Sequence, residues 1–463
     1  MDRILTFREV ADLEKEEGDE RNLGRSMGDA ACFGGMVGCG ESYFSAFALA
    51  VGLGETASGL VASIPLLVGG VLQLISPMAI QWVGGFRRWI VAGAALQALA
   101  FVPLALAAWH EFLTLPMMLL IASVYWAAGL STGPAWNTWI EQIVPSQQRA
   151  RFFSRRSRLQ QSCTFGTLMI AGLVLHWTSR EGIALLGFAG LFGLAALLRL
   201  MSAGFLHRTR EPSGLDETSV ELSSAESDSV ANTAANTSAD VPQTTSTRAA
   251  LRLLVYLVAM QVFIQLSGPY FVPYMLGQLE FGYGVYVSLV AIAFLSKVIA
   301  LSFWGRVAEK AGATKVLWFG GIGLVPLASL WIVSTNIYWL AMIQMVSGVA
   351  WAAYELGFFL LFFEMLPANQ RTRLLTYYNF ANTLAVCLGA LTGAAILSQF
   401  GCESETYYYL FGISSVGRML CLALLAGIVL PNVSLKAIRM RILSVRPGAA
   451  SVTAPIIASA EEP

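Results

Sequence analysis

The sequence predicts an all-α polytopic membrane protein, with twelve transmembrane helices arranged as two parallel, pseudo-symmetric bundles of six. Its 463 residues are 56% hydrophobic and only 13% charged, and the mean hydropathy is +0.63. The charged residues are confined to short islands between apolar runs of about 20 residues, the length of a helix that crosses a bilayer. A long polar run, residues 207–250, lies near the midpoint, and the segments on either side of it repeat one plan.

The polar run 207–250 is rich in Ser, Thr, Asp and Glu. Such a composition buries too little apolar surface to offset the entropy of ordering, so we expect a flexible cytosolic linker. It separates an N-terminal six-helix bundle, residues 29–206, from a C-terminal six-helix bundle, residues 251–430. The acidic residues 1–28 lack the basic start and short apolar core of a signal peptide. We expect them to form a partly helical cytosolic tail, and residues 431–463 to form a second cytosolic tail.

Twelve spans follow from the apolar runs, six before the linker and six after it, and we number them 1 to 12 in chain order. The predicted spans are 29–53, 57–82, 89–109, 115–141, 158–178, 182–204, 251–275, 284–305, 315–334, 338–364, 374–399 and 406–430.

Lysine and arginine give the orientation, because they are enriched in cytosolic segments. Of the 29 basic residues, 25 lie in the two tails or in the turns that follow even-numbered spans. Three more lie within spans, and only Arg180 lies in a turn that follows an odd-numbered span. We therefore expect both termini and the linker in the cytosol, and the protein in the cytoplasmic membrane.

Three short motifs recur in the same order, at the same place in each half and displaced by 219 to 228 residues. This pattern indicates a duplication. Because both copies start on the cytosolic side, the repeats are parallel and related by an axis along the membrane normal. The pairs are Pro145-Ser-Gln-Gln-Arg149 with Pro367-Ala-Asn-Gln-Arg371, Leu191-Phe192-Gly193 with Leu410-Phe411-Gly412, and Gly84-Gly-Phe-Arg87 with Gly312-Ala-Thr-Lys315.

The turn after span 8 reads Gly305-Arg-Val-Ala-Glu309-Lys310-Ala-Gly312-Ala-Thr-Lys315 and resembles the signature of the major facilitator superfamily, with Glu309 in place of Asp. The copy after span 2 keeps Gly84 and Arg87 but has Pro77 for the first glycine and Gln81 for the acid. The end of span 4, Trp139-Ile-Glu141 to Arg149, is similar to bacterial members. These motifs are specific for the superfamily but not for a subfamily.

The resemblance implies that spans 1, 4, 7 and 10 line a central cavity and that the two signature loops act as a cytosolic latch between the halves. Glycines at 305 and 312 would permit a tight turn there. Since Glu309 is charged and Gln81 is neutral, we expect the latch after span 2 to be the weaker one.

Four ionisable residues lie deep within spans: Glu41, Lys297, Glu355 and Arg418. Such groups are costly in the hydrocarbon region and usually face protein or water. One interpretation is that they form structural ion pairs. The other, implied by the resemblance, is that Glu41 and Glu355 face the cavity as proton carriers, with Lys297 as a counter-ion or a contact for an anionic solute. Burial raises the pKa of a carboxylate, which suits that role.

Other residues are assigned by their place in the spans. We expect Arg199 and Arg418 to tie their own halves together, and Glu141 and Glu364 to pair with Arg149 and Arg371. Glycines in spans 1 and 11, among them Gly34, Gly38, Gly389 and Gly393, should allow close helix approach. Aromatic and amide side chains on cavity-type spans suit a polar organic solute, although each alone is also typical of helix packing. The candidates are Tyr43, Trp126, Trp136, Asn137, Gln261, Gln265, Trp351 and Tyr354.

The sequence therefore predicts a secondary transporter, with alternating access for a sugar, metabolite or drug and with a proton as the candidate coupling ion. An uncoupled facilitator, and a receptor or lipid-handling protein on the same scaffold, remain the alternatives. No phosphate-binding loop and no His-x-x-x-His pair occurs, so neither an ATP-driven pump nor a metalloenzyme is expected. We expect no cofactor, no metal site and no nucleic-acid partner, and a monomer in the bilayer.

Overall fold

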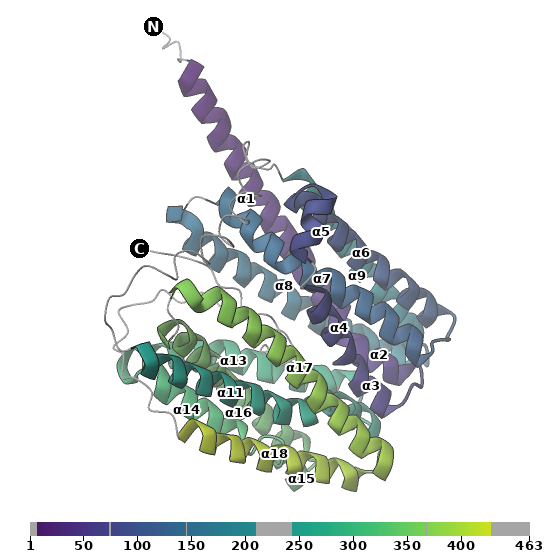
Figure 1. Cartoon of the computed structure of the whole chain (residues 1–463). Helices are drawn as coiled ribbons and strands as arrows, with labels where there is room; N and C mark the ends of the chain where they lie inside the picture. The colour runs from purple at the N-terminus through teal and green to yellow at the C-terminus, as the bar shows by residue number, and fades with distance from the viewer. Residues whose placement is uncertain (1–6, 74–75, 145, 210–242, 366–367, 427–463) are drawn as a thin grey trace.

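The computed structural model describes residues 7–73, 76–144, 146–209, 243–365 and 368–426, and the secondary structure within these ranges is helical. We call the described residues up to 209 the first half and those from 243 the second half. Figure 1 shows the helices of each half gathered side by side, with the two groups meeting along their length.

The first half begins with a long helix that continues from the acidic tail into span 1 without a break. Its elements are α1 (Phe7–Cys39), η1 (Glu41–Tyr43), α2 (Phe44–Ala50), α3 (Glu55–Val61), α4 (Ile64–Leu72), α5 (Ser76–Val83), α6 (Phe86–Trp109), α7 (Leu115–Ile143), α8 (Ser146–Arg180) and α9 (Ala184–Arg208).

The second half repeats this order, with more interruptions in its first and third spans. Its elements are α11 (Gln243–Ser267), η3 (Gly268–Tyr270), α12 (Phe271–Pro273), η4 (Tyr274–Gln278), α13 (Tyr283–Ala311), α14 (Ala313–Leu324), α15 (Leu330–Val333), α16 (Ile337–Met365), α17 (Ala368–Phe400) and α18 (Ser404–Ala426).

Nine segments of the described chain are long and apolar enough to cross a membrane. The other three predicted spans have a visible reason for falling short of that measure. Span 1 is interrupted after Cys39 by η1, span 5 lies in α8 with a polar and basic N-terminal part, and in span 9 α14 ends after 12 residues.

The ends of the predicted linker need correction. His207 and Arg208 belong to α9, and α11 already begins at Gln243, so helix extends into both ends of the predicted linker. In the N-terminal tail, α1 begins at Phe7, in agreement with the expected partly helical tail. Residues 1–6, 210–242 and 427–463 lie outside the described ranges.

The two halves share one packing scheme. In each half the first helix contacts the fifth and sixth, and the fourth contacts the second and third: α1 with α8 and α9, and α11 with α17 and α18. Between the halves, α8 contacts α13, and α17 contacts α3 and α4. In each case the fifth helix of one half meets the second span of the other half. The duplication read from the sequence is therefore present in three dimensions.

The first helix of each half breaks at the equivalent place. The 3-10 turns Glu41–Tyr43 and Gly268–Tyr270 are displaced by 227 residues, and each ends on a buried tyrosine. Tyr43 Oη donates to the carbonyl of Leu168 at 2.8 Å, and Tyr270 Oη donates to that of Ala390 at 2.6 Å. Each tyrosine thus fastens the broken helix to the fifth helix of its own half.

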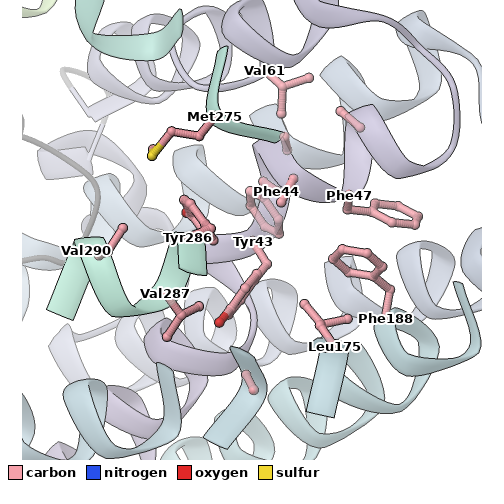
Figure 2. Close-up of a cluster of buried hydrophobic side chains, with 14 of the residues drawn as sticks. Tyr43, Phe44, Phe47, Val61, Leu175, Phe188, Met275, Tyr286, Val287 and Val290 are labelled. Atoms are coloured by element: carbon pink, nitrogen blue, oxygen red, sulfur yellow. The ribbon is translucent and has the colours of Figure 1, made fainter. Parts of the chain in front are cut away.

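Tyr43 also lies at the contact between the halves, where its ring centroid is 6.5 Å from that of Tyr286 on α13. Figure 2 shows these two rings within a buried apolar cluster to which α2, α3, α8, α9, η4 and α13 contribute. The hydrophobic core is thus continuous across the two halves at this point.

Glycines allow the first and fifth helices of each half to approach closely, as the sequence predicts. A Cβ atom at Gly38 would lie 2.3 Å from the carbonyl oxygen of Thr164, and one at Gly389 would lie 2.3 Å from that of Val262. The glycine lies on the first helix in the first half and on the fifth helix in the second half. The same contact between helices is therefore made by a glycine on either one of the two helices.

We expect Gly38→Ala and Gly389→Ala to lower the unfolding free energy by about 1–3 kcal/mol each, because the added methyl meets a backbone carbonyl that cannot move easily. Thermal unfolding of the purified protein in detergent measures the effect. Gly166→Ala on α8 and Gly412→Ala on α18 are matched controls, since nothing lies within 4 Å of their added Cβ atoms. Equal behaviour of the two pairs would contradict the close-approach explanation.

Candidate substrate and coupling site

Glu41 lies in the break of the first helix, where η1 replaces regular α-helix. Its carboxylate Oε2 accepts a hydrogen bond from the Tyr125 hydroxyl on α7 at 2.6 Å. Tyr125 is buried, whereas Glu41 is only half-buried, and Trp126 lies edge-on to the tyrosine ring at 5.8 Å. An acid, a hydroxyl and an indole therefore meet where spans 1 and 4 face each other.

Lys297 on α13 and Glu355 on α16 form a buried ion pair, with Nζ and Oε1 2.7 Å apart. Their side chains are only 9% and 4% exposed. Of the two sequence interpretations, the structure thus places these residues as a pair between spans 8 and 10. The pairing keeps this part of the second half neutral, as a low-dielectric site requires.

A second ion pair, between Asp29 on α1 and Arg156 on α8, was missed by the sequence reasoning. Arg156 Nη2 lies 2.7 Å from Asp29 Oδ2, and the guanidinium lies over the Trp136 ring at 4.0 Å from its centroid. Asp29 stood at the predicted edge of span 1 and Arg156 among the basic residues before span 5. Span 1 contacts span 5, so an acid on one and a base on the other were the signal that could have predicted this pair.

Arg199 on α9 continues this network. Its Nε and Nη2 donate to Gln97 Oε1 at 2.9 and 2.6 Å, and its Nη1 donates to Ser202 Oγ, which in turn donates to Asp29. These contacts join the sixth helix to the third and, through Ser202, to the first helix of its own half.

Arg418 is the equivalent residue of the second half, and it uses a backbone acceptor. Its Nη1 donates to the carbonyl of Leu324 and its Nη2 to Ser267 Oγ, both at 2.9 Å. Leu324 is the last residue of α14, where the helix breaks, so its carbonyl is available. A broken third helix thus supplies the acceptor that Gln97 supplies in the first half.

Several of the aromatic and amide candidates are buried within the protein. Tyr43 belongs to the buried core described above. Tyr354 is buried, with the half-buried Trp351 ring perpendicular to it at 6.0 Å. Gln265 is buried beside Gly268. Gln261 is fully buried, yet neither Oε1 nor Nε2 has a hydrogen-bond partner among the described residues.

Buried amides without partners are rare, because each unmade hydrogen bond costs about 1–3 kcal/mol. Among the described residues, Gln261 is thus a buried amide whose donors and acceptor both lack a partner within the protein.

The signature loops adopt equivalent turns. Gly84 and Gly312 have φ values of 77° and 87°, a region that favours glycine, and both close the turn that follows an even-numbered span. Gly305 lies inside α13 rather than in the turn, which corrects its predicted role. Arg87 is half-buried, and Gln81, Lys310 and Lys315 are exposed.

Several predicted contacts cannot be placed, since the side chains concerned lie outside the described part of the chain. The lopsided cytosolic latch and the two acid–arginine pairs therefore stay predictions. The residues are Asn137, Glu141, Arg149, Glu309, Glu364 and Arg371.

We expect Lys297→Met to destabilise the protein by about 3–5 kcal/mol, because it leaves Glu355 as a buried carboxylate without its cation. The double variant Lys297→Met/Glu355→Leu should recover most of that loss, since no unpaired charge remains. Thermal unfolding in detergent measures both. If the double variant is as unstable as the single one, the pair does not act as a charge-compensating unit.

Comparisons with known proteins agree with this architecture. Residues 253–437 match the family model described as Major Facilitator Superfamily. A nucleoside transporter, NupG, is similar in structure with a TM-score of 0.60 and 13% identity, covering 88% of this chain and 98% of that chain.

Two further solved structures have the same fold. A bacterial homologue of the iron transporter ferroportin in an inward-facing state has a TM-score of 0.65 at 13% identity, covering 89% of this chain and 98% of that chain. A D-xylose–proton symporter has a TM-score of 0.60 at 14% identity, covering 88% and 96%. Among curated proteins none matches in sequence. The family model thus matches the second half of the chain, and the solved structures share its fold over both halves.

Proposed function

We propose that this protein is a secondary transporter of the major facilitator superfamily, that it moves a small polar organic solute across the cytoplasmic membrane, and that Glu41 carries a coupling proton. The observation that carries the proposal is the Tyr125–Glu41 hydrogen bond of 2.6 Å in the broken part of the first helix. A half-buried carboxylate can exchange protons with water, and a hydroxyl partner can hold either the charged or the neutral acid. The broken helix also leaves backbone groups free for ligands, as at other transporter sites.

The polar side chains of the second half support an organic solute. Gln261 offers both amide donors and a carbonyl acceptor from α11, and the Trp351–Tyr354 pair offers aromatic surface from α16. Such a combination suits a ring that carries hydroxyl or amide groups. Because a nucleoside transporter and a D-xylose–proton symporter share the fold, nucleosides and pentoses are the first solutes to test in a thermal-shift screen.

We expect Glu41→Gln to keep solute exchange but to lose accumulation driven by a pH gradient, because the amide mimics the permanently protonated acid. Purified protein in sealed vesicles, with a solute found by the screen, measures both activities. Glu405→Gln, an exposed acid at the start of α18, is the matched control and should accumulate solute like the native protein.

The same vesicles separate the alternatives. If Glu41→Gln and Glu355→Gln both accumulate solute normally, neither acid carries the proton. If the native protein equilibrates solute without accumulating it, the protein is an uncoupled facilitator. Binding of a solute with no movement at all would favour a receptor.

We also propose that both termini and residues 207–250 lie in the cytosol, which the distribution of Lys and Arg supports. In a variant without the native cysteines, Arg88→Cys and Thr335→Cys should react with an impermeant maleimide from opposite sides of the membrane. Both positions are exposed, in the turn regions that follow spans 2 and 9. Reaction of both from the same side would contradict the twelve-span topology.

A further inference from the structure

The end of the molecule that carries the turns after odd-numbered spans, which we call the outer face, contains a carboxylate held by the opposite half. Glu55 begins α3 of the first half. Its Oε2 accepts a hydrogen bond from Tyr407 Oη at 2.5 Å, and its Oε1 accepts one from Gln278 Nε2 at 2.8 Å. Ser404 Oγ donates to Gln278 Oε1 at 3.2 Å and so fixes the amide. Both partners of Glu55, and Ser404 behind them, belong to the second half.

The surrounding contact is too close for larger side chains. A Cβ atom at Gly277 would lie 2.5 Å from Glu55 Oε1, and one at Gly59 would lie 2.1 Å from the Tyr270 ring. Thr56 Oγ1 lies 3.5 Å from Cys402 Sγ beside them. The carboxylate is therefore seated in a fitted contact between the halves.

The repeat shows what is special about this contact. Tyr407 corresponds to Phe188, displaced by 219 residues, and both rings pack in equivalent aromatic clusters. In the reciprocal place, Phe188 meets Tyr283, the first residue of α13, edge-on at 5.8 Å. At this place two aromatic rings meet, whereas at the equivalent place on the other side a hydroxyl and a carboxylate bond to each other.

We propose that Glu55 is a positioning residue for transport: its bonds to Tyr407 and Gln278 hold the outer face closed, and they must break whenever the solute site opens outward. The proposal rests on alternating access between the halves. Glu55 and Gln278 are both half-exposed, so on separation both groups can return to water. A latch of this kind is reversible, because hydration of the freed carboxylate offsets much of the lost hydrogen bonding.

The cleanest test replaces only the hydroxyl. Tyr407→Phe installs the residue that the first half already has at Phe188, so the packing is conserved. Spin labels at Glu181 and Thr335, exposed outer-face positions of the first and second half, report the separation of the halves by double electron–electron resonance. We expect Tyr407→Phe and Glu55→Ala each to raise the population of long distances by at least about fivefold.

The double variant Tyr407→Phe/Glu55→Ala should exceed the larger single effect only slightly, since both changes break the same bond. Tyr409→Phe is the matched control, because that side chain is 69% exposed on the same helix, and it should leave the distances unchanged. Unchanged distances in both single variants, or lower thermal stability without a change in distance, would overturn the latch. The measurement needs no solute, so it is independent of whether Glu41 carries a proton.

Discussion

Inside a bilayer a buried polar group without a hydrogen-bond partner is costly, and the buried arginines of the sixth and twelfth spans show how this chain lowers that cost. Arg199 and Arg418 are 5% and 4% exposed, and each bonds to other helices of its own half. An unsatisfied guanidinium there would cost several kcal/mol. These hydrogen bonds therefore join the sixth helix of each half to other helices of the same half.

The acceptors of the two arginines explain a difference in the helices themselves. Where the first half offers the Gln97 side chain, the second half offers the carbonyl of Leu324 at the end of α14. The following turn, which includes Pro326, breaks the helix and leaves that carbonyl without an intrahelical donor. The helix break thus supplies the hydrogen-bond acceptor that the Gln97 side chain supplies in the first half.

The duplicated halves differ in their buried polar groups. Both halves keep a broken first helix and a tyrosine that ties it to the fifth, but only the first places an acid, Glu41, in the break. The second half instead holds the Lys297–Glu355 pair. A symmetric scaffold with asymmetric polar groups fits the function that we propose, in which the two halves move and the polar groups select solute and ion.

The sequence by itself determined the span number, the repeat and the helix contacts made by glycine, because apolar length, motif order and residue size are local properties. It also singled out Glu41, Lys297 and Glu355 as charges in apolar runs. Only the tertiary structure decided which polar side chains pair with one another. Asp29 and Arg156 are 127 residues apart, and Glu55 and Tyr407 are 352 apart. No local pattern encodes such pairs, since they depend on which helix faces meet, and that is set by packing across the whole chain.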